Sequence, residues 1–153
     1  MVNKQKLYSI TLVSAAMFSM LLNTAGSEPF ADITNYYGYN VSIIDTATNN
    51  ITTNVTGLNH PYGIAVFSDG TKEYLTNKGN NTVSVNNTTT NKATATVPVG
   101  LELYGVAVTP DGEDVYVVNV GSYTAPSIVS VINTTTNKVT TNVTVGSRPV
   151  AFG

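Results

Sequence analysis

Residues 82–100, TVSVNNTTTNKATATVPVG, and residues 129–146, VSVINTTTNKVTTNVTVG, are two versions of one sequence. A looser third version, VSIIDTATNNITTNVTG, occupies residues 41–57. Self-similarity of this kind indicates a fold built several times over from one supersecondary unit. The fold class therefore depends on the period of the repeat and on the structure of a single unit.

The period lies in the forties. YGIAV at residues 62–66 returns as YGVAV at residues 104–108, which is an offset of 42 residues. The next interval, from Val83 to Val129, is 46 residues because GSYTAPS is inserted at residues 121–127. Helical arrays and propeller blades share periods of this length, so the residues within one unit must decide between them.

The residues within a unit favour β-strands. Val and Thr dominate, and after Lys138 the apolar positions alternate with polar ones, as in a half-buried strand. Polar turns such as SDGTK separate the apolar runs. The second unit is predicted to contain four strands, at residues 62–67, 73–77, 82–86 and 93–99. Four short antiparallel strands per unit predict an all-β, β-propeller-type fold.

The number of strands departs from a complete ring. We expect repeat units at about residues 32–61, 62–103 and 104–148, and a lone closing strand at residues 149–153. The first unit lacks a first strand, so the total is about three blades in a partial or permuted propeller. Propellers typically have about four to eight blades. The chain is therefore a fragment of a longer protein, a shortened relative, or a protomer that completes its ring by association. We expect the two end strands to pair, within one chain or between chains.

The composition excludes several functions. Only 10% of the residues are charged, against about 25% in ordinary soluble proteins. The formal net charge of -2 provides no basic surface, so we expect no nucleic-acid partner and no membrane contact beyond the N-terminal segment. The absence of cysteine excludes disulfides and thiolate metal sites.

The N-terminal segment has the parts of a secretory signal peptide. MVNKQK carries two lysines, the next 16 residues are largely apolar, and small residues follow. We predict a signal peptide at residues 1–27, with Ala25 and Ser27 in the two small-residue positions before the cleavage site, and a secreted cell-surface domain at residues 28–153. A retained membrane anchor is the alternative, although a span needs about 20 apolar residues.

Two stretches resemble a known repeat. EYLTNKGNNTVSVNNTTTNKATATVPVG at residues 73–100 and YGVAVTPDGEDVYVVN at residues 104–119 resemble the YVTN β-propeller repeat of archaeal surface-layer and other cell-surface proteins. YLTN at residues 74–77 is closer to the motif than YVVN at residues 116–119. The resemblance covers about residues 32–153. It implies a propeller at the cell surface and no shared catalytic motif.

Eight asparagines lie in the glycan acceptor pattern N-x-[ST]. In a secreted chain some of them are expected to carry sugar, which would supply the solubility that the scarce charges do not. The alternative is that a sequence so rich in Asn and Thr contains the pattern by chance. The glycosylation candidates are Asn40, Asn50, Asn54, Asn80, Asn86, Asn87, Asn133 and Asn142.

Catalytic groups are scarce. His60 is the single histidine, so a metal site would need several carboxylates around it. DGEDV at residues 111–115 lacks the alternating ligand spacing of a calcium loop and favours a hairpin turn. There is no phosphate loop, dinucleotide motif or nucleophile elbow. We therefore expect a non-enzyme with no catalytic residues, no metal and no cofactor.

One end of the blades is the expected interaction face. In an antiparallel blade, the connections from strand two to three and from strand four to the next strand one lie at the same end. Exposed tyrosines there are expected to contact proteins or glycans; the alternative is that several of them pack between blades. The interaction-face candidates are Tyr36, Tyr37, Tyr39, His60, Glu102, Tyr123 and Arg148.

Two functions remain. The preferred hypothesis is a secreted, surface-layer or adhesion-like module with a structural or interaction role, whose partners are other surface proteins, glycans or copies of itself. The alternative is an extracellular propeller enzyme or small-ligand binder, lactonase-like, that uses a central channel after ring completion.

The signal-peptide prediction has a direct test. Protein recovered from the cell surface should begin near Glu28, because the charged start, apolar run and small-residue exit form a cleavable signal. N-terminal sequencing or intact mass measures this. Recovery of Met1 on the surface protein would support the retained anchor instead.

Overall fold

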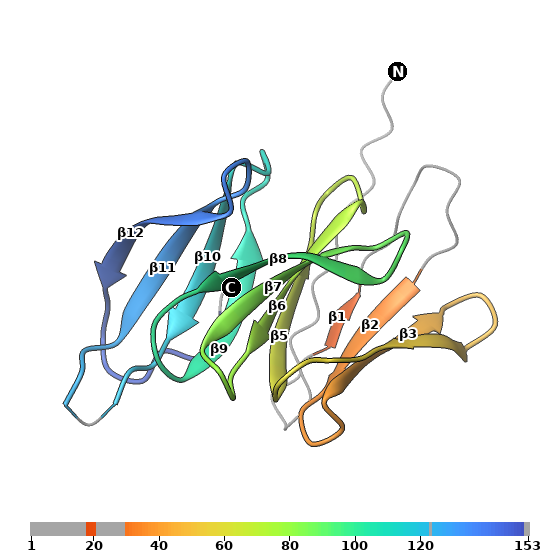
Figure 1. Cartoon of the computed structure of the whole chain (residues 1–153), viewed down its shortest axis with the longest axis horizontal. Helices are drawn as coiled ribbons and strands as arrows, with labels where there is room; N and C mark the ends of the chain where they lie inside the picture. Colours follow the sequence, from red (N-terminus) through yellow and green to blue (C-terminus); the bar gives the residue numbers. More distant parts are fainter. Residues whose placement is uncertain (1–17, 21–29, 123, 152–153) are drawn as a thin grey trace.

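The protein is built from β-strands. The computed structural model describes residues 18–20, 30–122 and 124–151, which form twelve strands and no helix. These ranges accordingly contain no helix long and apolar enough to cross a membrane. The strands form three four-stranded antiparallel sheets, which stand side by side in Figure 1.

Each sheet follows the order of the chain. The first sheet consists of β1 (Phe18–Met20), β2 (Phe30–Asn35), β3 (Asn40–Asp45) and β4 (Asn50–Val55). The second consists of β5 (Pro61–Val66), β6 (Lys72–Asn77), β7 (Thr82–Asn87) and β8 (Lys92–Pro98). The third consists of β9 (Leu103–Val108), β10 (Asp114–Asn119), β11 (Ile128–Asn133) and β12 (Lys138–Thr144).

The predicted fold class is confirmed. The sheets are consistent with three blades of a partial propeller, and the described residues do not close into a ring. Val83 pairs with Val97 in the second sheet, and its repeat equivalent Val129 pairs with Val143 in the third. A register shift follows at the same place in both strand pairs. The two stretches that indicated the repeat therefore form equivalent hairpins.

The ends of the chain differ from the prediction. Phe18–Met20 forms β1 and pairs with Ala31–Ile33 of β2, so the first sheet contains the strand that was expected to be missing. At the other end, Val150 O accepts a hydrogen bond from Gly105 N at 3.1 Å, so this part of the predicted closing strand lies beside β9. Pairing of the two ends within one chain was wrong, because β1 already occupies the edge of β2. Pairing between chains stays a prediction.

β1 lies inside the predicted signal peptide. The remainder of that prediction, at residues 1–17 and 21–27, falls outside the described residues. If cleavage occurs as predicted, it removes β1 and uncovers the edge of β2 at Ala31–Ile33.

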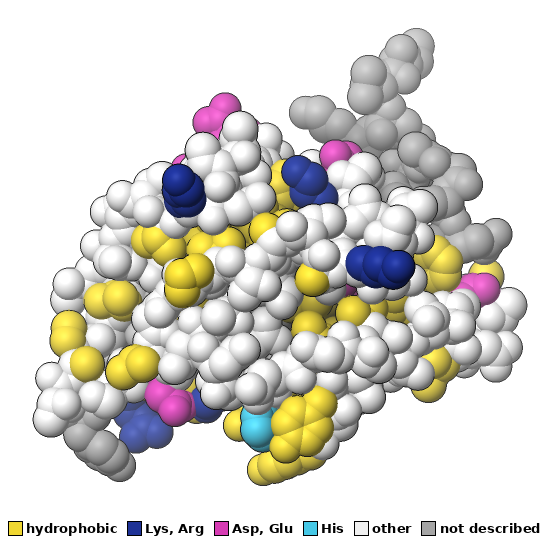
Figure 2. Space-filling view, in the orientation of Figure 1, with side chains coloured by type: hydrophobic (Ala, Val, Ile, Leu, Met, Phe, Trp, Pro, Cys, Tyr) yellow, Lys and Arg dark blue, Asp and Glu magenta, His cyan; other side chains and the backbone are white. Residues whose placement is uncertain are grey.

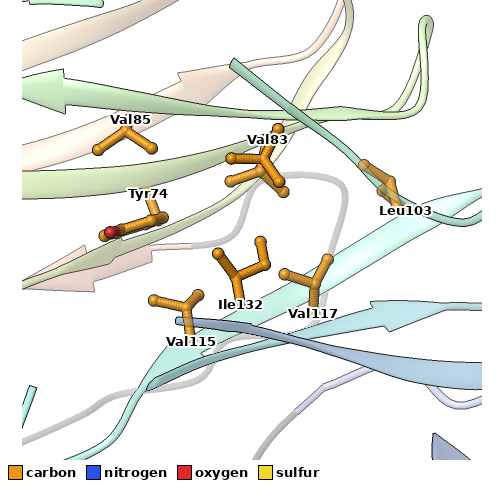
Figure 3. Close-up of a cluster of buried hydrophobic side chains, with 8 residues drawn as sticks. Tyr74, Val83, Val85, Leu103, Val115, Val117 and Ile132 are labelled. Carbon is orange, nitrogen blue, oxygen red and sulfur yellow. The ribbon is translucent and has the colours of Figure 1, made fainter. Parts of the chain in front are cut away.

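The main core lies between the second and third sheets. Alternate side chains of β6, β7, β10 and β11 point into this space, as the period of a strand requires. Figure 3 shows Tyr74 and two valines of the second sheet opposite β10 and β11 side chains of the third. The buried members are Tyr74, Val83, Val85, Val97, Leu103, Val115, Val117 and Ile132.

The Asn-rich turns have a structural cause. In NTTTNK, the side chain of the first asparagine accepts hydrogen bonds from the turn: Asn133 Oδ1 accepts from Thr136 N at 3.0 Å, and Asn87 Oδ1 from Thr90 N at 2.8 Å. The last asparagine, Asn137 or Asn91, takes a left-handed conformation with φ of 52° or 54°. Asparagine tolerates both roles better than most residues. The repeated motif is thus a turn sequence.

The sheets are joined through backbone and threonine groups. Thr34 Oγ1 donates to Tyr62 O at 2.8 Å, which links the first sheet to the second. One period later, Thr76 Oγ1 donates to Tyr104 O at 3.0 Å and accepts from Gly63 N at 2.7 Å. A Cβ on Gly63 would lie 2.6 Å from Tyr104 O, so only glycine permits this approach. Thr76 therefore bridges two backbone groups of adjacent sheets.

The third equivalent position lacks the hydroxyl. Val118 stands where Thr76 and Thr34 stand in the earlier units, and here Gly105 N bonds directly to Val150 O. The same pair of backbone positions is joined in both cases, with a bridging hydroxyl in one and without it in the other.

This contrast predicts different costs for matched substitutions. Thr76→Val removes the hydroxyl that bonds to Gly63 N and Tyr104 O, and a direct bond between these two groups would require the sheets to move, so the free energy of unfolding should fall by about 1–3 kcal/mol. Urea unfolding measures this. The reverse change, Val118→Thr, is the control and should leave the free energy of unfolding higher than in Thr76→Val. Equal losses in the two variants would contradict the bridging role.

Candidate functional site

The connections at one end of the sheets come together as predicted. Lys78 N, in the β6–β7 turn, donates to His60 O in the β4–β5 connection at 3.1 Å. One period on, Val120 N donates to Glu102 O at 3.0 Å. The β2–β3 turn, at residues 36–39, lies at the same end because β2 and β6 are equivalent strands. We call this end, with Tyr36, Tyr37, Tyr39, His60, Tyr62, Lys78, Glu102 and Tyr104, the aromatic face.

Ring contacts run along the aromatic face. The ring of Tyr36 lies 4.9 Å from that of Tyr37 and 4.8 Å from that of His60, measured between centroids. His60 also meets Tyr39, at 4.7 Å. Tyr62 connects this group to Tyr104 by an edge contact of 4.7 Å between ring centroids. Figure 2 shows the single histidine, in cyan, beside hydrophobic side chains at the lower edge of the molecule.

A lysine occupies the other end of the row of rings. Lys78 Nζ lies 3.9 Å from the ring centroid of Tyr104 and forms an ion pair with Glu102 Oε2 at 3.1 Å. Partial burial acts to lower the pKa of Lys78, but the hydrogen bonds with Tyr104 and Glu102 outweigh it and the pKa is raised. Lys78 therefore stays charged at neutral pH and holds the second and third sheets together.

Comparison of equivalent positions in the repeat shows which residues of the aromatic face lie at a joint, which is the contact between two neighbouring sheets, and which do not. Lys78, Tyr104 and Glu102 correspond to Tyr36, Tyr62 and His60, which stand 42 residues earlier. Between the second and third sheets, an ion pair lies against a tyrosine ring. Between the first and second sheets, three aromatic rings occupy the equivalent positions. Tyr36 and His60 help to join two sheets. This agrees with the alternative that several of the tyrosines pack between blades.

Tyr37 and Tyr39 have no counterpart ring in the second unit, although Tyr39 also contacts His60. The repeat equivalent of Tyr37 is Gly79, and that of Tyr39 is Asn81. Tyr37 is 85% exposed and Tyr39 is 48% exposed. Tyr39 also has φ of 56°, a left-handed conformation that is unusual for a bulky residue. These two rings are held at the surface by the turn itself.

The structure places most of the predicted interaction residues on this face. Tyr36, Tyr37, Tyr39 and His60 touch one another, and Glu102 joins them through Lys78. Arg148 has φ of 55° and stands one unit beyond Glu102, at the equivalent position. Tyr123 lies outside the described residues. Sequence reasoning missed Lys78, Tyr62 and Tyr104 as members, although their spacing of one period was available as a signal.

Seven of the eight glycosylation candidates remain open to solvent at least in part. Asn86 is the exception: it is 1% exposed, and its Nδ2 donates to Glu73 Oε1 at 3.0 Å. A glycan would be attached to that same nitrogen and would have no space there. The prediction for Asn86 was therefore wrong, and the buried amide has a structural role.

A polar cluster lies at the joint between the first two sheets. The carboxyl of Glu73 in β6 is hydrogen-bonded to that of Asp32 in β2 and to Asn86 in β7. Burial and then the charge of Asp32 raise the pKa of Glu73 to about 7, and burial raises the pKa of Asp32. The described residues contain no group of three His, Cys, Asp or Glu side chains placed for a metal ion.

Comparison with solved structures shows a common fold. Hydrazine synthase of Kuenenia stuttgartiensis is similar over 80% of this chain and 34% of its own, with a TM-score of 0.75 and 26% identity. A functionally unknown protein of Desulfotomaculum acetoxidans is similar over 80% of this chain and 38% of its own, with a TM-score of 0.71 and 18% identity. The chain thus spans little more than a third of either structure. No family model matches it, and no curated protein does.

The geometry of Lys78 predicts a measurable coupling. Lys78→Met removes a charge from a side chain that is only 15% exposed, so the free energy of unfolding should fall by about 1–2 kcal/mol. Glu102→Gln should lose less than about 1 kcal/mol, because the Glu102 side chain is 54% exposed. A double-mutant cycle with Tyr104→Leu measures the ring contribution. Additive losses in that cycle would show that the lysine and the ring do not interact.

Proposed function

We propose that this protein is a secreted, non-enzymatic module of the cell surface, of the YVTN propeller-repeat type, that binds a surface protein or glycan through its aromatic face. The observation that carries the proposal is Tyr39, an exposed aromatic residue in a left-handed backbone conformation. Its role is inferred by comparing its turn with the equivalent turn in the second repeat unit.

The turn that holds Tyr39 differs from its counterpart in the next unit. NYYGYN at residues 35–40 corresponds to NKGNNT at residues 77–82. The second version follows ordinary turn chemistry, since its Asn81 has φ of 58°. The first version places a tyrosine at the equivalent position with φ of 56°. Folding of the turn does not require this tyrosine.

The backbone strain at Tyr39 needs a compensating benefit. Residues held in sparsely populated backbone regions cost on the order of 1–3 kcal/mol and cluster at binding sites. The Tyr39 ring meets only the edge of His60 at 4.7 Å and stays half exposed. Together with Tyr37 it presents adjacent aromatic surface, and rings with a polar tip are favoured in interfaces with proteins. Binding is the benefit that we infer.

Two features of the sequence support a location at the surface. The predicted signal segment directs the chain outward, and seven partly or fully exposed N-x-[ST] sites offer glycan attachment. Copies of the same chain are a further proposed partner, through the edge of β2 that signal cleavage would uncover.

The alternative function is an extracellular enzyme or small-ligand binder. One observation favours it: a similar solved structure is that of hydrazine synthase. The similarity covers 34% of that chain, and the part in common is a fold of repeated sheets. A fold of this kind hosts many functions, so the aromatic face carries more weight.

The proposal is tested by replacing Tyr39 with asparagine, the residue that the second unit has at the equivalent position. Tyr39→Asn should weaken binding of the secreted protein to cell envelopes of its source organism by at least about tenfold, the loss expected for an interface aromatic worth about 2 kcal/mol. The free energy of unfolding should be unchanged or rise by up to about 1 kcal/mol, because asparagine tolerates the left-handed turn. Co-sedimentation and thermal unfolding measure the two effects.

A matched control separates the aromatic face from exposed apolar surface in general. Ile51→Gln removes a side chain that is 60% exposed in β4, next to the turn at the opposite end of the first sheet, and should leave binding unchanged. Envelopes treated with protease or with periodate distinguish a protein partner from a glycan. Full binding by Tyr39→Asn would contradict the proposed role of this face.

A further inference from the structure

A buried carboxyl pair lies at the joint between the first and second sheets, away from the aromatic face. The Glu73 side chain is 1% exposed and accepts a hydrogen bond from Asn86 Nδ2 at 3.0 Å. Its carboxyl is also hydrogen-bonded to that of Asp32, which comes from the neighbouring sheet. The pair therefore connects two repeat units through two acidic groups.

This pair has no cationic partner. Among the described residues, the ion pair found is that of Lys78 with Glu102, at the aromatic face. A buried carboxylate without a counter-charge is costly, because the protein interior solvates charge poorly. The hydrogen bond between Asp32 and Glu73 needs a proton on one of the two carboxyls, so a cation that binds here would replace this proton.

Unsatisfied oxygen acceptors accompany the carboxyl pair. Asp32 Oδ1, Asn86 Oδ1 and Asn91 Oδ1 are buried and have no hydrogen-bond partner within the protein, and the described residues contain one further atom of this kind, Asn119 Oδ1. Asn86 is 1% exposed, and its amide already touches Glu73. Buried acceptors that lack donors indicate a bound water or ion.

The next joint shows what the ordinary repeat places here. Asp32, Glu73 and Asn86 correspond to Tyr74, Val115 and Ile132 at the joint of the second and third sheets. Those three residues are fully buried in the apolar core of Figure 3. The fold therefore does not need acidic groups at these positions.

The same comparison predicts that Asn91 lies near the pair. Its repeat equivalent, Asn137, accepts a hydrogen bond from Tyr74 at 3.2 Å across the second joint. Tyr74 is the equivalent of Asp32, so repeat equivalence predicts that Asn91 lies on the side of the first joint opposite Asp32. Asn91 has no tyrosine hydroxyl there, and its Oδ1 is one of the unsatisfied acceptors.

We propose that the joint between the first and second sheets binds a divalent cation of the calcium class, held by Asp32, Glu73 and Asn86 with Asn91 at its margin. Carboxylate and amide oxygens are the ligands that calcium prefers, in sets of about six to eight completed by water. Two carboxylates balance the charge of the ion. Sequence reasoning expected no metal because these residues are far apart in the chain and show no ligand spacing.

Calcium titration of the metal-free chain tests the site. After removal of divalent ions with EDTA, CaCl2 at about 1 mM, the range in which extracellular calcium modules bind, should raise the melting temperature. Isothermal titration calorimetry should show one site per chain. Glu73→Gln should lower the affinity at least about tenfold, whereas the exposed Glu113→Gln should match the original chain.

A second variant guards against misfolding. Asp32→Tyr, Glu73→Val and Asn86→Ile together copy the second joint into the first, and this chain should fold in EDTA and show no response to CaCl2. The proposal is overturned if the original chain shows the same melting temperature with EDTA and with CaCl2. A melting temperature that depends on pH alone would also overturn it, because the carboxyl pair would then hold a shared proton.

Discussion

Each sheet of this protein can bury a face only against the next sheet, and the joints between sheets therefore determine everything else. The closest approach is between backbones: Gly63 lies under Tyr104 O, and Thr76 bridges them. This approach brings the connections at one end of neighbouring sheets together. Both the aromatic face and the carboxyl pair lie at joints, because only there do side chains from two units meet.

The two joints solve the same problem with different chemistry. The second uses an apolar core around Tyr74 and, at its end, Lys78 held by Glu102 against a ring. The first uses aromatic rings at its end and, in its interior, an apolar cluster that includes Val41, Val55 and Leu75 beside the acidic groups Asp32 and Glu73. Since equivalent strands form both joints, the repeat itself does not dictate these differences. They are where a repeat protein acquires function, and the proposed binding face and cation site both follow from them.

Much of the fold was predictable from the repeat. The period, the alternation after Lys138 and the Asn-rich turns determine strands and turns locally, and the four strands predicted for the second unit agree with β5 to β8 within one residue. The chain ends were not predictable in the same way. The pairing of Phe18–Met20 with β2 comes from an apolar segment that has the composition of a signal peptide and no similarity to the repeat.

Period and parity are local properties of the chain, so the strands, the turns and the end of the blades at which Tyr36, Tyr37, Tyr39 and His60 lie could be predicted from the repeat. The packing of neighbouring sheets decided which of these rings join sheets and which stay exposed. It also decided that Asn86 is buried and that Asp32 meets Glu73. These contacts join residues that are far apart in the chain, and no local pattern encodes them, because they arise only where one sheet packs against the next.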